Sequence, residues 1–395
     1  MAVKFLKGSY AEDILKIVAL CGEFPWSGLD MVRRDKKILI RTLLKIRKDG
    51  FMSVSGSAEM KTIRMTKKGL IPILELGDGY LEHYLGMTEG HKFRGGSKAS
   101  GAAGATQTWR RHRMAEILIT FLYSGVRVWD FEKPNIDLNI NTPKLINKDD
   151  IVFYTSRQLK NAGDGENKKV DFTRIMGALF SPGGIYPVYH TNKGLMKWQQ
   201  QGEMKAQILL ENIVNCNYNT ENVFNYHASR AIMFGKDINV FVDILKSNGG
   251  KRMQNNFELL SFDNTYNNIH FITLDNNGDD QLKMLMSKNW KEKMLNIIFP
   301  EEIRLSGMSD IDADARIDNT FVLSFLDGDI GRLKRFTKSS LIAPDYEFQV
   351  ICFPWQEEAL KKYSNSIKTS VINHEAFFNA FFERGWYCWT KKKIK

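Results

Sequence analysis

The sequence predicts a mixed fold, α/β or α+β, in which a small basic module of helices and one β-hairpin precedes a larger region of strands and helices. Two observations carry this prediction. Over residues 10–75, apolar residues recur mainly at helical spacing, with one pair of short alternating segments between them. From about residue 126, short apolar runs alternate with amphipathic segments, the pattern of a mixed or parallel sheet covered by helices.

Three helices are expected at the start of the basic module. The first covers residues 10–21, and the second is short, at 27–32, with Ser27 as a suitable N-cap. Asp35 can cap the third, which Gly50 ends at the usual C′ position. This third helix is amphipathic: one stripe is apolar, and the opposite side carries four cations within an arc of about 80°. The cations are Lys37, Arg41, Lys45 and Lys48, opposite Leu39, Leu43 and Ile46.

A hairpin follows the third helix. Residues 51–54 and 60–66 alternate in polarity around a small polar turn at 55–59. Three helices followed by a hairpin resemble a winged helix-turn-helix, in which the third helix enters the major groove and the hairpin touches the flanking backbone. The resemblance implies base contacts from Lys37, Arg41 and Lys45. Contacts to the DNA backbone would come from Lys48, Lys61 and Arg64, and Lys36 is a further DNA-binding candidate.

The charge of the chain supports this assignment. The net charge of +11 is concentrated at the N-terminal end, where residues 1–130 hold 22 basic and 13 acidic side chains. Residues 33–68 alone carry 12 basic and 3 acidic side chains. Such a local excess is the electrostatic footprint of a phosphate-backbone binder, although a solvated basic surface would give the same count.

A glycine-rich stretch at 86–108 predicts a flexible linker between the module and the rest of the chain. The stretch lacks the GxxxxGK[ST] pattern of a phosphate-binding loop. A helix is expected to begin directly after it, with Arg110, Arg111 and Arg113 in its first turn. Cations there oppose the helix macrodipole, which suggests a bound phosphate or an acidic partner, or else simple exposure to solvent.

The remainder is expected to form an α/β domain at 109–250 and a second lobe, or a continuation of the first, at 251–395. The winged helix-turn-helix domain is assigned to residues 1–85. Strands are expected near 126–131, 174–180, 185–191, 230–235, 268–274, 320–326 and 348–353. The aspartates at 310, 312 and 314 lack the glycine and terminal glutamate of a calcium loop and are interpreted as a solvated acidic loop.

Two phrases resemble a known family. TWRRHRMAEILITFLYSGV at 108–126 and IYPVYHTNKGLMKWQQQGEMKAQ at 185–207, together with the basic module, are similar to the replication-relaxation family of Gram-positive mobile elements. The resemblance implies a role in plasmid or conjugative-element replication, mobilisation or transfer. It also implies a second domain that resembles PD-(D/E)xK nucleases. The family members with such a domain include relaxases of the mobilisation type.

A nuclease of that kind needs carboxylates at adjoining strand ends to hold Mg²⁺ and a lysine to steady water or phosphate. Glu203 and Lys205 form the one suitable E-x-K triplet, and Asp171 lies just before an expected strand. The triplet falls in a helix, however, where residues i and i+2 point to different faces. The alternative is that Glu203 and Lys205 are surface helix residues.

The sequence therefore predicts a sequence-specific, cytoplasmic DNA-binding protein with an inactive nuclease-like domain and no resident cofactor. Its partners would be double-stranded DNA and other relaxosome or replication proteins, and a homodimer would imply an inverted-repeat target. The alternatives are a Mg²⁺-dependent DNA-nicking relaxase and a winged-helix transcription regulator with a ligand pocket. No apolar run is long enough to span a membrane, and four widely spaced cysteines indicate neither a zinc site nor a disulfide framework.

Overall fold

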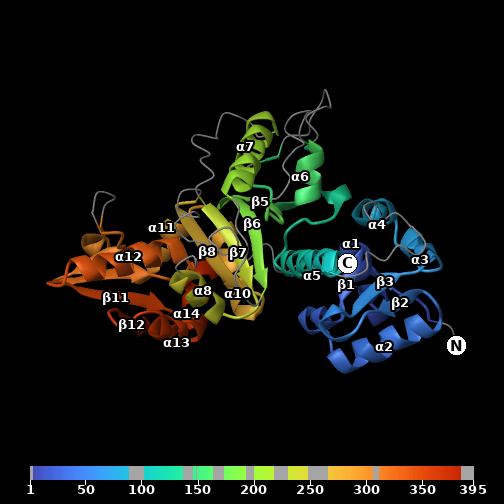
Figure 1. Cartoon of the computed structure of the whole chain (residues 1–395), viewed down its shortest axis with the longest axis horizontal. Helices are drawn as coiled ribbons and strands as arrows, with labels where there is room; N and C mark the ends of the chain where they lie inside the picture. Colours follow the sequence, from blue (N-terminus) through green and yellow to red (C-terminus); the bar gives the residue numbers. More distant parts are fainter. Residues whose placement is uncertain are drawn as a thin grey trace. The chain divides into compact units, whose positions relative to one another are not determined.

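The computed structural model shows a mixed α/β protein with three sheets among the residues that it describes (Figure 1). It describes residues 3–88, 102–136, 146–147, 149–162, 173–192, 200–217, 230–247, 266–305 and 311–383. Two compact units divide between Lys133 and Pro134. None of the described helices combines the length and apolar character that a membrane span requires.

The N-terminal unit is built from helices around a small antiparallel sheet. The sheet has the order β1-β3-β2, so that the last strand of the hairpin lies in the middle. Its strands are β1 (Glu23–Pro25), β2 (Met52–Ser55) and β3 (Thr62–Met65). Its longer helices are α1 (Tyr10–Cys21), α2 (Lys36–Lys48), α3 (Leu70–Glu75), α4 (Tyr80–Thr88) and α5 (Ala102–Tyr123), with 3₁₀ turns η1 (Trp26–Met31), η2 (Ala58–Met60) and η4 (Asp130–Glu132).

Most local predictions for this unit are confirmed. The first and third helices and the hairpin lie where the sequence places them. The short second helix exists as η1, but it begins at Trp26 and its N-cap is Pro25, so the predicted capping role of Ser27 is wrong. Apolar side chains of α1, α2 and β3 share one core in which Leu15, Leu43 and Ile63 are fully buried.

The C-terminal unit contains two sheets. The larger has the order β4-β5-β6-β7-β8: the first three strands are antiparallel, and β6, β7 and β8 are parallel. These strands are β4 (Val152–Thr155), β5 (Gly177–Ser181), β6 (Gly184–Asn192), β7 (Arg230–Gly235) and β8 (Asn268–Thr273). The continuous apolar runs of β7 and β8 suit strands that are buried on both faces.

The smaller sheet has the order β12-β11-β10-β9, with β10, β11 and β12 parallel and β9 antiparallel at one edge. The strands are β9 (Ala315–Ile317), β10 (Thr320–Ser324), β11 (Glu347–Cys352) and β12 (Lys368–Val371). The helices of this unit are α6 (Ser156–Ala162), α7 (Gln200–Asn217), α8 (Asn239–Lys246), α10 (Asn276–Met286), α11 (Trp290–Ile298), α12 (Ile330–Ile342), α13 (Pro354–Tyr363) and α14 (His374–Glu383), with the 3₁₀ turn η7 (Glu301–Ile303).

One hydrophobic core joins the two sheets of the C-terminal unit. Phe241 of α8 lies with its ring centroid 6.1 Å from that of Phe271 in β8 and 5.5 Å from that of Phe325 after β10. Phe336 of α12 contacts Phe348 of β11 with ring centroids 5.1 Å apart. The described residues after 251 therefore share one core and one compact unit with the preceding sheet: β8 is the last strand of that sheet, and β9 to β12 form the second sheet.

The structure differs from the sequence prediction around the first boundary. Residues 109–133 were expected in the second domain, but α5 packs on α1 and β1 in the N-terminal unit. Both ends of the expected linker are helical, at residues 86–88 and 102–108, and residues 89–101 lie outside the described part of the chain. The alanine-rich sequence after residue 101 explains the early start of α5, because alanine has the highest helix propensity.

The strand expected at 126–131 is wrong. Gly125 adopts a φ of 83° and the amide of Val126 donates to the Phe121 carbonyl at 2.9 Å, which ends α5 in a compact cap. Val126, Val128 and Trp129 are nonetheless buried, and Trp129 contacts Tyr80 of α4 with ring centroids 4.8 Å apart. The apolar run therefore reflects packing of the segment that follows the helix, in which Arg127 forms an isolated β-bridge but no strand develops.

Candidate functional site

Local sequence signals set the position and orientation of α2. The Asp35 carboxylate accepts a hydrogen bond from the Ile38 amide at 2.9 Å and caps the helix, as predicted. Gly50 has a φ of 80°, a backbone conformation that favours glycine. Leu39, Leu43 and Ile46 are fully buried against the core. Their burial fixes which side of α2 faces outward.

The outward face of α2 is basic. Lys37, Arg41, Lys45 and Lys48 are all exposed, and none of them forms an ion pair within the described part of the chain. Lys36, at the start of the helix, differs because it pairs with Asp30. The four side chains, which we call the basic face of α2, are thus available to an anionic partner. A helix with such a face can bind the phosphate backbone and base edges of DNA.

The hairpin contributes less free charge than the sequence suggested. The Lys61 ammonium lies 3.6 Å from the centroid of the Trp26 ring, so this cation packs against an aromatic face. The Arg64 guanidinium forms an ion pair with buried Glu23, with Nε 3.0 Å from Oε1. Arg111 of α5 reaches the same oxygen at 2.9 Å. Arg64 and Arg111 therefore neutralise one buried carboxylate and join the hairpin to α5.

The three arginines predicted at a helix start lie elsewhere. Because α5 begins at Ala102, Arg110, Arg111 and Arg113 occupy the middle of the helix and not its first turn. The argument from the helix macrodipole, which applies to the terminal turns, does not hold for them. Arg111 is explained by its ion pair with Glu23, and burial lowers its pKa although Glu23 opposes this shift.

The structure separates Glu203 from Lys205, two of the three residues proposed for a nuclease site. Glu203 and Lys205 lie on α7, where Glu203 is completely buried and Lys205 is exposed. They point to different faces, as two residues at i and i+2 of a helix must. The interpretation of Glu203 as a surface residue is therefore wrong, whereas that of Lys205 is confirmed. Asp171 lies outside the described residues.

The Glu203 carboxylate is occupied by hydrogen bonds. It accepts from the Thr173 hydroxyl at 2.6 Å, the Arg174 amide at 2.5 Å and the Tyr189 hydroxyl at 3.0 Å. Tyr189 also shares a hydrogen bond of 2.7 Å with the hydroxyl of buried Tyr266. Burial raises the pKa of Glu203 although its three donors oppose this shift. The arrangement joins α7 to the strand ends of β5 and β6, which is a structural role.

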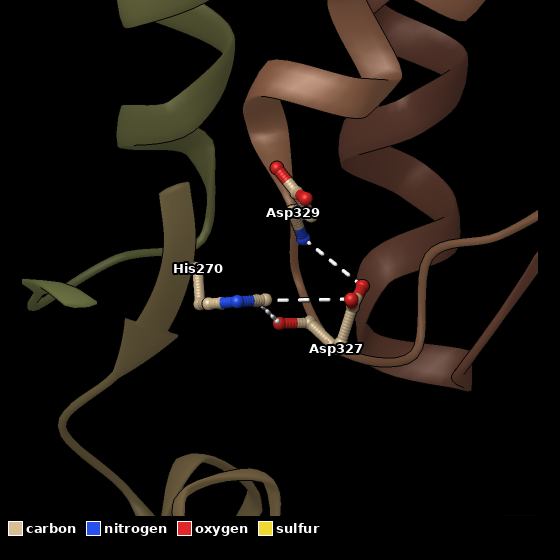
Figure 2. Close-up of side chains that lie close together, drawn as sticks. All are labelled: His270, Asp327 and Asp329. Atoms are coloured by element: carbon tan, nitrogen blue, oxygen red, sulfur yellow. Dashed lines mark hydrogen bonds and ion pairs between the residues drawn. The ribbon is translucent and has the colours of Figure 1, made fainter. Parts of the chain in front are cut away.

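A second cluster of chemically active residues, which sequence reasoning missed, lies in the C-terminal unit. Figure 2 shows His270 on β8 facing Asp327, with Asp329 two residues further along the segment that leads into α12. All three are buried, and each offers a possible ligand atom within 4.8 Å of the others. They come from distant parts of the sequence, which is why no spacing motif indicated them.

Hydrogen bonding shows that Asp329 is not available to a metal ion. One of its oxygens accepts from the amides of Ile269, Gly331 and Arg332, each at 3.1 Å. The other accepts from the Asn268 side chain at 2.6 Å. These contacts cap α12 and connect it to β8. A cation bound by the Asp329 oxygens would displace these donors and leave buried amides without hydrogen-bond partners.

His270 and Asp327 form a buried pair whose pKa values shift in opposite directions. Nδ1 of His270 lies 3.1 Å from the Asp327 carbonyl and 3.7 Å from its carboxylate. Burial lowers the pKa of His270 to about 4, and burial together with nearby Asp329 raises the pKa of Asp327 to about 7. Both side chains are therefore neutral between these two values.

We expect Asp327→Asn to make the stability of the protein more sensitive to acid. In the unfolded chain Asp327 loses its proton as pH rises above about 4, whereas the folded protein keeps it, so this group lowers stability as pH rises. His270 has the opposite effect. Below about pH 6.5 the unfolded chain binds a proton that the folded protein excludes, so this group lowers stability as pH falls. The two slopes oppose each other in the native protein. Without Asp327, the free energy of unfolding should fall by up to about 1.4 kcal/mol per pH unit between about pH 6.5 and 4, relative to the native protein.

Denaturant unfolding of the full chain across this pH range measures the effect. Asp345→Asn is the matched control, because it makes the same substitution at an exposed position. The free energy of unfolding of Asp327→Asn should not run parallel to the native and control values across this pH range. A parallel course would show that His270 and Asp327 are not both neutral in the folded protein.

A cavity of about 470 Å³ lies where β7 and β8 end. Asp237, Thr273, Asp275 and Trp355 are among the residues that line it. Asp237 accepts hydrogen bonds from the amide and side chain of Asn239, and Asp275 caps α10 through the Gly278 amide. These two carboxylates serve their own loops, whereas Asp243, which also lines the cavity, is exposed, and the buried indole nitrogen of Trp355 has no hydrogen-bond partner among the described residues.

Comparison with protein-family models, with curated proteins and with solved structures finds no match to this chain.

Proposed function

We propose that the protein binds double-stranded DNA through its N-terminal unit, acting as a winged helix-turn-helix. The observation that carries this proposal is the basic face of α2, formed by four exposed cations without ion-pair partners in the described structure. The surrounding elements support it: a helix, a short strand and η1 precede α2, and a hairpin follows that pairs with the short strand. This order is the one in which a third helix enters the major groove.

The contacts follow from the positions of the cations. Lys37, Arg41 and Lys45 are assigned to base edges and Lys48 to the phosphate backbone. Lys61 on the hairpin is assigned to flanking backbone, since this residue is only half-buried where it packs over Trp26. Arg64 and Arg111 are not assigned to DNA, because contact with phosphate would leave the buried Glu23 carboxylate without their charge.

For the C-terminal unit we propose a scaffold role in the replication or transfer of a mobile element. The proposal rests on the resemblance to the replication-relaxation family that the sequence of residues 185–207 suggests. The separation of Glu203 from Lys205 and the saturation of the Glu203 carboxylate by donors favour a scaffold over a nickase. Other DNA-processing proteins would be its partners.

Duplex binding by the full chain is expected to depend steeply on salt. Each phosphate that a cation neutralises releases condensed counterions, which gives a slope of about −0.9 in log affinity against log salt. Lys48 and Lys61, the two cations assigned to phosphate, predict a slope near −1.8, and thus a loss of about 12-fold between about 50 and 200 mM salt. Fluorescence anisotropy with a labelled duplex measures this slope. An affinity that stays constant over this range would contradict the proposal.

A further inference from the structure

Two large aliphatic side chains are exposed on α2. Ile38 is 44% exposed and Leu44 is 47% exposed, whereas Leu39, Leu43 and Ile46 of the same helix are fully buried. Burying an aliphatic side chain is favourable, so a helix that needed only to rest on its core and present cations would gain nothing from them. They are candidates for contact with a partner.

Both side chains border the basic face of α2. At 100° per residue, Leu44 lies about 20° outside Lys37 on one side, and Ile38 lies about 20° outside Lys45 on the other. An aliphatic residue therefore lies at each edge of the arc that the cations occupy. A partner that meets this surface must offer negative charge and, beside it, small apolar groups.

The major groove of DNA has this combination. Phosphates line it, and the thymine 5-methyl group is its characteristic apolar feature, which aliphatic side chains contact. We propose that Ile38 and Leu44 recognise thymine methyl groups, an inference that rests on the proposed binding of duplex DNA. Arg41 lies three residues from each of them, or about 4.5 Å along the helix axis. Since base pairs are about 3.4 Å apart, the thymines flank the base that Arg41 contacts, within about two base pairs.

Replacing thymine with uracil tests the proposal, because uracil pairs identically and lacks only the methyl group. The full-length protein is first used to select a duplex from a randomised pool, and the selected duplex is then synthesised with thymine or with uracil. We expect a loss of about fourfold in affinity for each contacted methyl group, the value for burial of one methylene. Equal affinity for the two duplexes would overturn the proposal, as would selection that enriches no sequence.

Variants assign the contacts to each residue. Leu44→Ala should abolish the loss caused by uracil at one position and Ile38→Ala the loss at another, while both retain the salt dependence of the native chain. Leu341→Ala is the matched control, since Leu341 is an aliphatic residue that is 72% exposed on α12. A thymine preference that persists in Leu44→Ala and Ile38→Ala would overturn the assignment to these side chains. A native chain that binds no duplex at all would instead refute the proposed function, and the inference with it.

Discussion

Replacing Lys37, Arg41 and Lys45 together with alanine is expected to lower the affinity of the full chain for its selected duplex by about 1000-fold. Each base-contacting cation contributes about 1–3 kcal/mol, and about 4 kcal/mol in total corresponds to this factor. The fold should be unaffected, because the three side chains are exposed and form no ion pair within the described structure. Titration of labelled duplex at constant salt measures the loss.

The matched control removes the same charge elsewhere. Lys288, Lys293 and Lys338 lie in the C-terminal unit, and their triple alanine variant changes the net charge equally. We expect it to bind within a fewfold of the native chain, since these lysines do not belong to the proposed DNA-binding helix. Equal losses in the two triple variants would show that overall charge, and not the basic face of α2, determines binding.

Arg41→Ala separates base recognition from phosphate contact. If Arg41 contacts a base, its loss should cost about 1–3 kcal/mol on the selected duplex and relax the preference at one position. If it contacts phosphate, the selected and random duplexes should lose affinity equally and the salt slope should fall by about one. The second result would reassign Arg41 without contradicting DNA binding.

The parts of the structure that the sequence predicted well depend on short-range signals. Asp35, the apolar spacing of α2 and Gly50 lie within one segment, and they defined its ends and its buried face correctly. The parallel strands β7 and β8 were likewise predicted, because strands that are buried on both faces are continuously apolar. In such cases the local pattern and the tertiary structure require the same residues.

The errors concern residues whose role depends on distant partners. Glu203 was interpreted either as catalytic or as a surface residue, yet its three donors lie 14 to 30 residues away on other elements. His270 meets Asp327 across 57 residues of sequence. No periodicity reports such pairings, because they are decided by how sheets and helices pack. An apolar setting around a polar residue was the one available signal, as with His270 in the strand NIHFIT.

The roles of Asp312 and Asp314 also depend on a partner that is distant in the sequence. Both were interpreted as part of a solvated acidic loop, but Asp314 is buried and forms a two-contact ion pair with Arg332 of α12, at 2.8 and 3.2 Å. Asp312 accepts from Nε of the same arginine at 2.9 Å. Burial would lower the pKa of Arg332, but the two aspartates outweigh it and hold the pKa above its ordinary value.

Arg332→Met is therefore expected to destabilise the protein by about 3–5 kcal/mol, the cost of leaving a buried charge without its partner. Met keeps much of the volume of the side chain, so the lost charge rather than a cavity accounts for the effect. Arg335→Met is the control. Arg335 lies one turn further along α12 and also pairs with Asp312, at 2.9 Å, but its side chain is 40% exposed. An exposed pair contributes no more than about 1 kcal/mol.

A further variant identifies the cause of the loss. Adding Asp314→Asn to Arg332→Met removes the uncompensated charge while keeping an oxygen for the Ser324 amide, so the double variant should be more stable than Arg332→Met alone. Equal destabilisation by Arg332→Met and Arg335→Met, with no recovery in the double variant, would show that this buried ion pair does not govern the stability of the C-terminal unit.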